Sequence, residues 1–247
     1  MFAIGCALFL HLSKVLGKEA LIRTSMLSYE ISYYRALIVT VILLPTPLCF
    51  KSVSFLNIPR KVTIPLYLQG LISAAISISL YVAIDVIPYS EAIMLSYTKP
   101  VFGVIAARVY LKERVTFIDF VALATSLIAI YFYVDPGNLL SSHSKEDFKN
   151  GEDPGNVVGI IFALVAGILG GLEIICYRKL ERLDVHVFVE TFFGSIFGLL
   201  IAPIFIIPAQ EHSPQEPRYT LWGILFLIFM GLAYLIGQIL EDIAYHL

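Results

Sequence analysis

A lysine inside a long apolar segment is the residue of this sequence with the clearest capacity for chemistry. Lys99 is followed directly by Pro100, and both lie in the middle of the apolar run from Ser90 to Tyr110. A lysine at the centre of a bilayer costs roughly 2.5–3.5 kcal/mol, so its side chain should face a wet cavity or a carboxylate. Pro100 removes a backbone donor and predicts a kink at this depth. Two hypotheses stay open: Lys99 binds an anionic group of a substrate, or it forms a structural ion pair.

Polar residues recur at helical spacing around this lysine and in other apolar runs. Ser96, Lys99 and Gly103 share one helix face, with Tyr97 beside them. Another run carries polar residues four positions apart, namely Gln69, Ser73, Ser77, Tyr81 and Asp85. A helix that faces lipid all round would not carry such a band. The band indicates either a cavity wall or hydrogen bonding between helices.

Two later segments repeat this pattern. One helix face near the end of the chain carries Tyr234, Gln238, Glu241, Asp242 and Tyr245. This face indicates a cavity wall, or its two acids simply lie in water, because they are close to the end of the apolar run. Glu173 is a possible partner for Lys99 or a protonatable group, and Tyr177 could face the same cavity. The predicted substrate-binding residues are Lys99, Ser96, Tyr97, Ser73, Ser77, Tyr81, Glu173 and Gln238.

Composition places these residues in a membrane protein. Hydrophobic residues make up 58% of the 247-residue chain and charged residues 15%, against about 45–50% and about 25% in soluble domains. The net charge of −2 suggests no nucleic-acid partner. Because the histidines form no metal motif and no nucleophile motif is visible, we expect neither an enzyme nor a cofactor.

The apolar runs predict an all-α integral membrane protein with about eight transmembrane helices, since a span needs roughly 20 apolar residues. The predicted spans are 1–16, 33–50, 64–84, 90–110, 117–134, 157–177, 185–207 and 221–240. The first is short. In the sixth span, four small residues recur every fourth position and predict close helix packing: Gly159, Ala163, Gly167 and Gly171. Arg35 and Glu190, which start corresponding spans, are expected to be anchors at the membrane interface.

The order of features along the chain indicates two related units. Residues 1–134 hold five spans, 135–156 form a polar linker, and 157–247 hold three spans. Setting Gly70 on Gly231 places Ala83 on Ala244 without a gap. Because the first unit has an odd number of spans, the second enters the membrane from the opposite side, which is the inverted repeat of secondary transporters.

Basic residues in the loops indicate which side of the membrane each loop faces. The side that holds Lys51, Arg60, Lys61, Lys112 and Arg114 is richer in short basic loops, so we assign it to the cytoplasm. Both termini of this multi-pass protein then face the cytoplasm.

One stretch resembles the third-to-fourth-helix signature of the drug/metabolite transporter superfamily, and more narrowly its EamA-domain proteins and the solute carrier 35 group. The matching residues are Tyr81, Ala83, Pro88, Ser90, Glu91, Ala92, Leu95, Tyr97, Pro100, Val101, Phe102 and the run Leu111-Lys112-Glu113-Arg114. The resemblance implies a ten-helix fold of two inverted five-helix units that moves small polar metabolites. This chain corresponds to five plus three of those helices, without the last two, which complete the cavity wall in the family.

Two functions follow as expectations. The first is secondary transport of a small polar or anionic metabolite by alternating access, with the lipid bilayer and the substrate as partners. The alternative is a truncated, non-transporting paralogue or fragment that acts through partner association. The sequence leaves monomer and homodimer open.

Overall fold

The computed structural model describes residues 2–24, 26–49, 55, 58–111, 121, 123–125, 127–128, 154–212 and 221–245. Over these residues the regular structure is helical, which confirms the all-α prediction. The longer helices are α1 (Phe2–Thr24), α2 (Ser28–Leu43), α4 (Arg60–Val86), α9 (Pro154–Glu181), α10 (Val187–His212) and α11 (Leu221–Tyr245). The shorter ones are α3 (Thr46–Cys49), α5 (Tyr89–Ser96), α6 (Lys99–Ala106) and the π-helix η1 (Ala107–Leu111).

Six helical segments of the described residues are long and apolar enough to cross a membrane, and they match the second, third, fourth, sixth, seventh and eighth predicted spans. The first predicted span continues to Thr24 and forms the 23-residue helix α1. This helix is less apolar than the others because it also holds Lys14, Lys18, Glu19 and Arg23. Most of the fifth predicted span, 117–134, lies outside the described residues.

The fourth span is broken rather than continuous. Helix α5 ends at Ser96, two turn residues follow, and α6 begins at Lys99. Pro100 lies in the first turn of α6 and has no N–H with which to reach the carbonyl of Ser96. The predicted kink is therefore a break just before the proline. It places the start of α6, and with it Lys99, at a turn inside the bundle.

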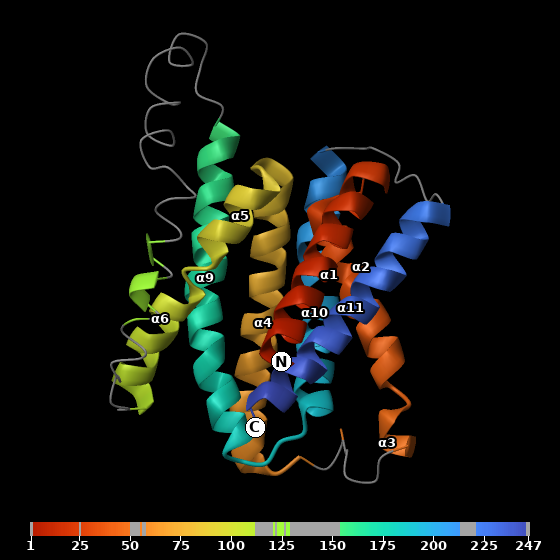
Figure 1. The fold of residues 1–247 in the computed structure, drawn as a ribbon. Helices are drawn as coiled ribbons and strands as arrows, with labels where there is room; N and C mark the ends of the chain where they lie inside the picture. The colour runs from red at the N-terminus through yellow and green to blue at the C-terminus, as the bar shows by residue number, and fades with distance from the viewer. Residues whose placement is uncertain are drawn as a thin grey trace.

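Helices of the first predicted unit pack along helices of the second. Helix α1 packs along α11, α4 packs along α9, and α10 packs against both α2 and α4. Figure 1 shows α4 near the centre of the bundle, with α5 crossing in front from the top of α4 toward α9 and α6 on the outer side of α9. In the same view α1 and α4 run in the opposite direction to α9 and α11.

Glycines on α9 let α5 and α6 come close. A Cβ atom added to Gly171 would lie 2.5 Å from the Cβ of Phe102 and 2.7 Å from the backbone nitrogen of Gly103. A Cβ on Gly167 would lie 2.1 Å from the Oγ1 of Thr98. No side chain fits at these distances, so the small residues serve as the sequence predicted, by bringing two helices into backbone contact.

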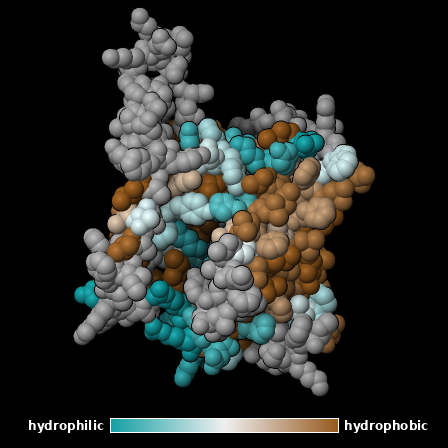
Figure 2. All heavy atoms as spheres, viewed as in Figure 1, coloured by the Kyte–Doolittle hydropathy of each residue, from teal (hydrophilic) through white to brown (hydrophobic). Residues whose placement is uncertain are grey.

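An apolar cluster fills one end of the bundle. It joins buried residues of α1, α2, α4, α5, α9 and α11, among them Ala20, Ile31, Ile84, Ile93 and Met230. The outer surface also carries large apolar side chains, such as Leu8 and Ile161, which are 65% and 53% exposed. Figure 2 shows this hydrophobic exterior on one flank and hydrophilic side chains gathered around a hollow in the face turned to the viewer. A lipid environment suits this apolar exterior.

Candidate functional site

A polar cavity lies between the helices of the two predicted units. Its volume is about 140 Å³, enough for several water molecules, since each needs roughly 10–15 Å³. The lining residues come from α1, α2, α4, α5, α6, α9 and α11. They include three cations, two carboxylates and four tyrosines: Lys14, Arg35, Lys99, Glu173, Glu241, Tyr81, Tyr97, Tyr177 and Tyr234. With every acid and base ionised, the formal charge of the lining is +1.

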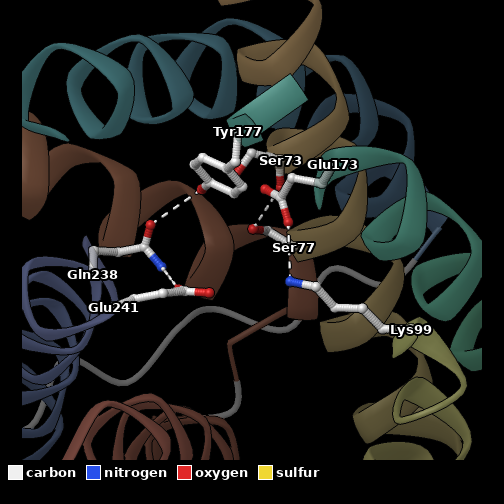
Figure 3. Close-up of polar contacts among 7 residues, drawn as sticks. All are labelled: Ser73, Ser77, Lys99, Glu173, Tyr177, Gln238 and Glu241. Atoms are coloured by element: carbon white, nitrogen blue, oxygen red, sulfur yellow. Dashed lines mark hydrogen bonds and ion pairs between the residues drawn. The ribbon is translucent and has the colours of Figure 1, made fainter. Parts of the chain in front are cut away.

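An ion pair crosses the cavity between the two predicted units. The Nζ of Lys99 donates to the Oε2 of Glu173 at 3.4 Å, and the side chains are 37% and 8% exposed. Figure 3 shows Lys99 reaching from α6 toward Glu173 on α9. The break before Pro100 turns the lysine inward. The pair satisfies one of the two sequence hypotheses for Lys99, while its partly exposed ammonium still faces the cavity.

Helix α11 supplies an amide and a carboxylate on the opposite wall. The Oε1 of Gln238 accepts a hydrogen bond from the Tyr177 hydroxyl at 3.2 Å, and its Nε2 donates to Glu241 at 3.1 Å. Figure 3 shows this chain of contacts facing Lys99 and Glu173. The amide is thus fixed in one orientation, with its donor toward the acid and its acceptor toward the tyrosine.

All eight residues predicted from the sequence to bind substrate line this one cavity. The polar row on α4 divides, however. Its middle members, Ser73, Ser77 and Tyr81, lie in the lining, whereas Gln69 is 1% exposed and outside it, and Asp85 accepts a hydrogen bond from Ser28. The division follows from the drift of a four-residue row around a helix, about 40° at each step.

One prediction about a charged residue was wrong, and one open choice is decided. Arg35 is not an interfacial anchor but lines the cavity, about two turns into α2. Its span was expected to begin at residue 33, whereas the helix begins at Ser28, which carries Arg35 deeper into the bundle. Glu241 does not lie in bulk water but lines the cavity beside Gln238. The side chains of Asp242 and Tyr245 lie outside the described residues.

Sequence reasoning also left Lys14 out of the site. Its Nζ lies 5.8 Å from the ring centre of Tyr97, and its charge interacts with those of Lys99, Arg35 and Glu241. Lys14 could have been found by the reasoning applied to Lys99, because it too is a lysine within an apolar run. Because the first predicted span was short and ended at residue 16, Lys14 resembled a residue at a helix end.

The part of the sequence that carries Lys14, Arg35 and Lys99 matches a known protein family. Residues 1–134 match the EamA-like transporter family, which is more than half of the chain. The chain belongs to the EamA-like transporter family. The match confirms the resemblance seen around Pro100, and it covers the elements that carry Lys14, Arg35 and Lys99.

Individual EamA-like relatives extend the likeness into the second unit. The chain is 28% identical over 236 residues to an uncharacterized transporter of Clostridium kluyveri, covering 94% of this chain and 71% of the relative. It is 25% identical over 213 residues to solute carrier family 35 member G1 of Mus musculus and of Homo sapiens. Those matches cover 85% of this chain, which spans only 55% of each mammalian relative. The family and these relatives are membrane transporters rather than enzymes.

Proposed function

We propose that this EamA-like protein is a secondary transporter that moves a small polar or anionic metabolite by alternating access, with the substrate bound in the central cavity. The observation that carries this proposal is the lining itself. Charged and hydrogen-bonding groups from five membrane-spanning helices and α1 converge on one cavity, inside a bundle whose outer surface is apolar. Ionisable groups at membrane depth are costly, and they mark substrate or ion pathways.

The reciprocal helix packing supports the repeat on which alternating access depends. If α1, α2 and α4 correspond to α9, α10 and α11, the pair α1 with α11 is the counterpart of the pair α9 with α4. The ungapped alignment that pairs Gly70 with Gly231 also pairs Ser73 with Tyr234 and Ser77 with Gln238. These cavity-lining positions on α4 are therefore matched by cavity-lining positions on α11. A binding site at the interface of two inverted units is the arrangement typical of secondary transporters.

The apolar cluster supports alternating access at one end of the cavity. Leu80, Tyr81 and Ala166 belong both to the cavity lining and to the cluster, so the packed side chains begin where the polar cavity ends. Rocking of one unit against the other would part these side chains and close the opposite end. Access to the substrate would then pass from one side of the membrane to the other.

Uptake by reconstituted vesicles tests the proposal. The full chain in proteoliposomes is expected to take up at least one member of a panel of radiolabelled small acids and polar metabolites above protein-free vesicles. Lys99→Ala is expected to lower that uptake at least tenfold, because it leaves the Glu173 carboxylate facing an anionic substrate. Unchanged uptake by Lys99→Ala rules out the role of Lys99. Wild-type vesicles that take up nothing contradict transport and favour the non-transporting alternative.

A further inference from the structure

Arg35 has a different set of partners from Lys99. Its guanidinium carbon lies 4.2 Å from the ring centre of Tyr234 and 5.8 Å from that of Tyr81. One terminal nitrogen donates a hydrogen bond to the Oγ of Ser77. Within the part of the chain that the structure describes, no carboxylate comes within ion-pair distance of Arg35, whereas Lys99 is paired with Glu173.

The neutral partners hold this guanidinium in place. Ser77 donates its own hydroxyl hydrogen to the backbone oxygen of Ser73 at 2.9 Å, so its oxygen is free to accept from Arg35. The Tyr234 ring centre lies 4.2 Å from the guanidinium carbon, within the range of a cation–π contact. Because the N–H groups of a guanidinium lie in its plane, those not bound to Ser77 point outward along its edge. That edge is the part of arginine that binds oxyanions through two parallel hydrogen bonds.

We propose that Arg35 binds the carboxylate of the transported molecule, and that this molecule is a small organic acid with one net negative charge. This inference rests on the proposed function and names the substrate class of the same cavity. Lys99 and Glu173 then serve a second purpose, as a charged link between α6 of the first unit and α9 of the second.

The charge of the cavity favours a monocarboxylate over a phosphate ester. The lining carries a formal charge of +1, which one carboxylate balances. A phosphate monoester carries about −1.5 to −2 at neutral pH, so it would leave an excess negative charge beside Glu173 and Glu241. Tyr97 and Tyr177, which are partly exposed in the lining, add aromatic surface for the carbon body of an organic acid.

Binding measurements on the detergent-purified full chain test the inference. The probes are lactate and benzoate within a panel of monocarboxylates, the uncharged amides lactamide and benzamide, and inorganic phosphate. Wild-type protein is expected to bind at least one acid at least tenfold more tightly than its amide, and more tightly than phosphate. Arg35→Gln is expected to lose at least tenfold of that preference. Arg35→Lys should recover only part of it, because an ammonium is a point charge without the fork geometry.

One variant serves as a control. Arg23→Gln removes the same group from an exposed site, where Arg23 pairs with Glu19 on the same helix, and should leave acid binding unchanged. Acid preference within twofold of wild type in Arg35→Gln overturns the inference, as does equal binding of acid and amide by the wild type. Phosphate that binds as tightly as the acids overturns the carboxylate assignment.

The two proposals fail in different ways. Wild-type vesicles that take up nothing contradict the proposed transport, whatever Arg35 binds. Wild-type uptake of an acid that Arg35→Gln leaves within twofold overturns the assignment of Arg35 and leaves transport standing. If Arg35→Gln does not yield monodisperse protein, Arg35→Lys alone decides, since affinity equal to wild type contradicts binding through the guanidinium edge.

Discussion

The cavity residues were predictable from the sequence wherever a polar side chain interrupts a long apolar run. Lys99 and Glu173 are charged residues well inside such runs, and the cost of placing them in lipid requires a polar neighbour. Their pairing at 3.4 Å meets that requirement. Arg35 and Lys14 escaped the same reasoning, because the expected ends of their spans fell within a few residues of each. Helix boundaries depend on contacts that the sequence does not display, so residues near them are the hardest to place.

A double-mutant cycle on Lys99 and Glu173 measures their pairing. Lys99→Met and Glu173→Gln should each lower the melting temperature in detergent. The double variant should be more stable than the sum of the two effects predicts, with a coupling of about 0.5–3 kcal/mol. The matched control is Arg23→Met with Glu19→Gln, an exposed pair at 3.1 Å whose coupling should be close to zero. Additive effects at Lys99 and Glu173 would show that the two charges do not interact.

At the level of helices, the apolar runs predicted six described spans, and the small-residue row on α9 predicted where another helix would come close. The sequence did not show how sharply the fourth span breaks. A proline inside a helix is compatible with a bend or with a full interruption, and the neighbouring packing decides between them. Here α5 and α6 both lie against the glycines of α9. The close approach of Gly171 to Phe102 and Gly103 therefore holds the broken segment in place.

The substitution Gly171→Ala tests this contact. Its added Cβ would lie 2.5 Å from the Cβ of Phe102, so α6 must shift, and we expect a loss of about 1–3 kcal/mol in stability. The matched control is Gly194→Ala on α10, where the new Cβ would meet Ser73 at an ordinary 3.6 Å. Thermal unfolding in detergent should separate the two variants. Equal melting temperatures would contradict close packing of α6 on α9.

At the level of the whole molecule, the order of features predicted two inverted units, and this stays a prediction, supported by the packing of α1 along α11 and of α4 along α9. The structure adds α2 to the cavity wall, whereas none of the described side chains of α10 lines it. Such a difference arises because the two units carry different side chains on related helices. Arg35 on α2 reaches Ser77 on α4, whereas α10 meets the same helix through apolar contacts such as Tyr67 with Phe193.

The account as a whole requires that the cavity open to both sides of the membrane in turn. With Cys6, Cys49 and Cys176 replaced by alanine, a single cysteine at Ser96 would report from the cavity lining, and one at Ile161 would report from the outer surface. A membrane-impermeant thiol reagent should label Ser96→Cys in right-side-out and in inside-out vesicles, with a bound acid slowing both reactions. Ile161→Cys should react in neither. Labelling of Ser96→Cys from one side only, or from neither, would contradict a transport path through this cavity.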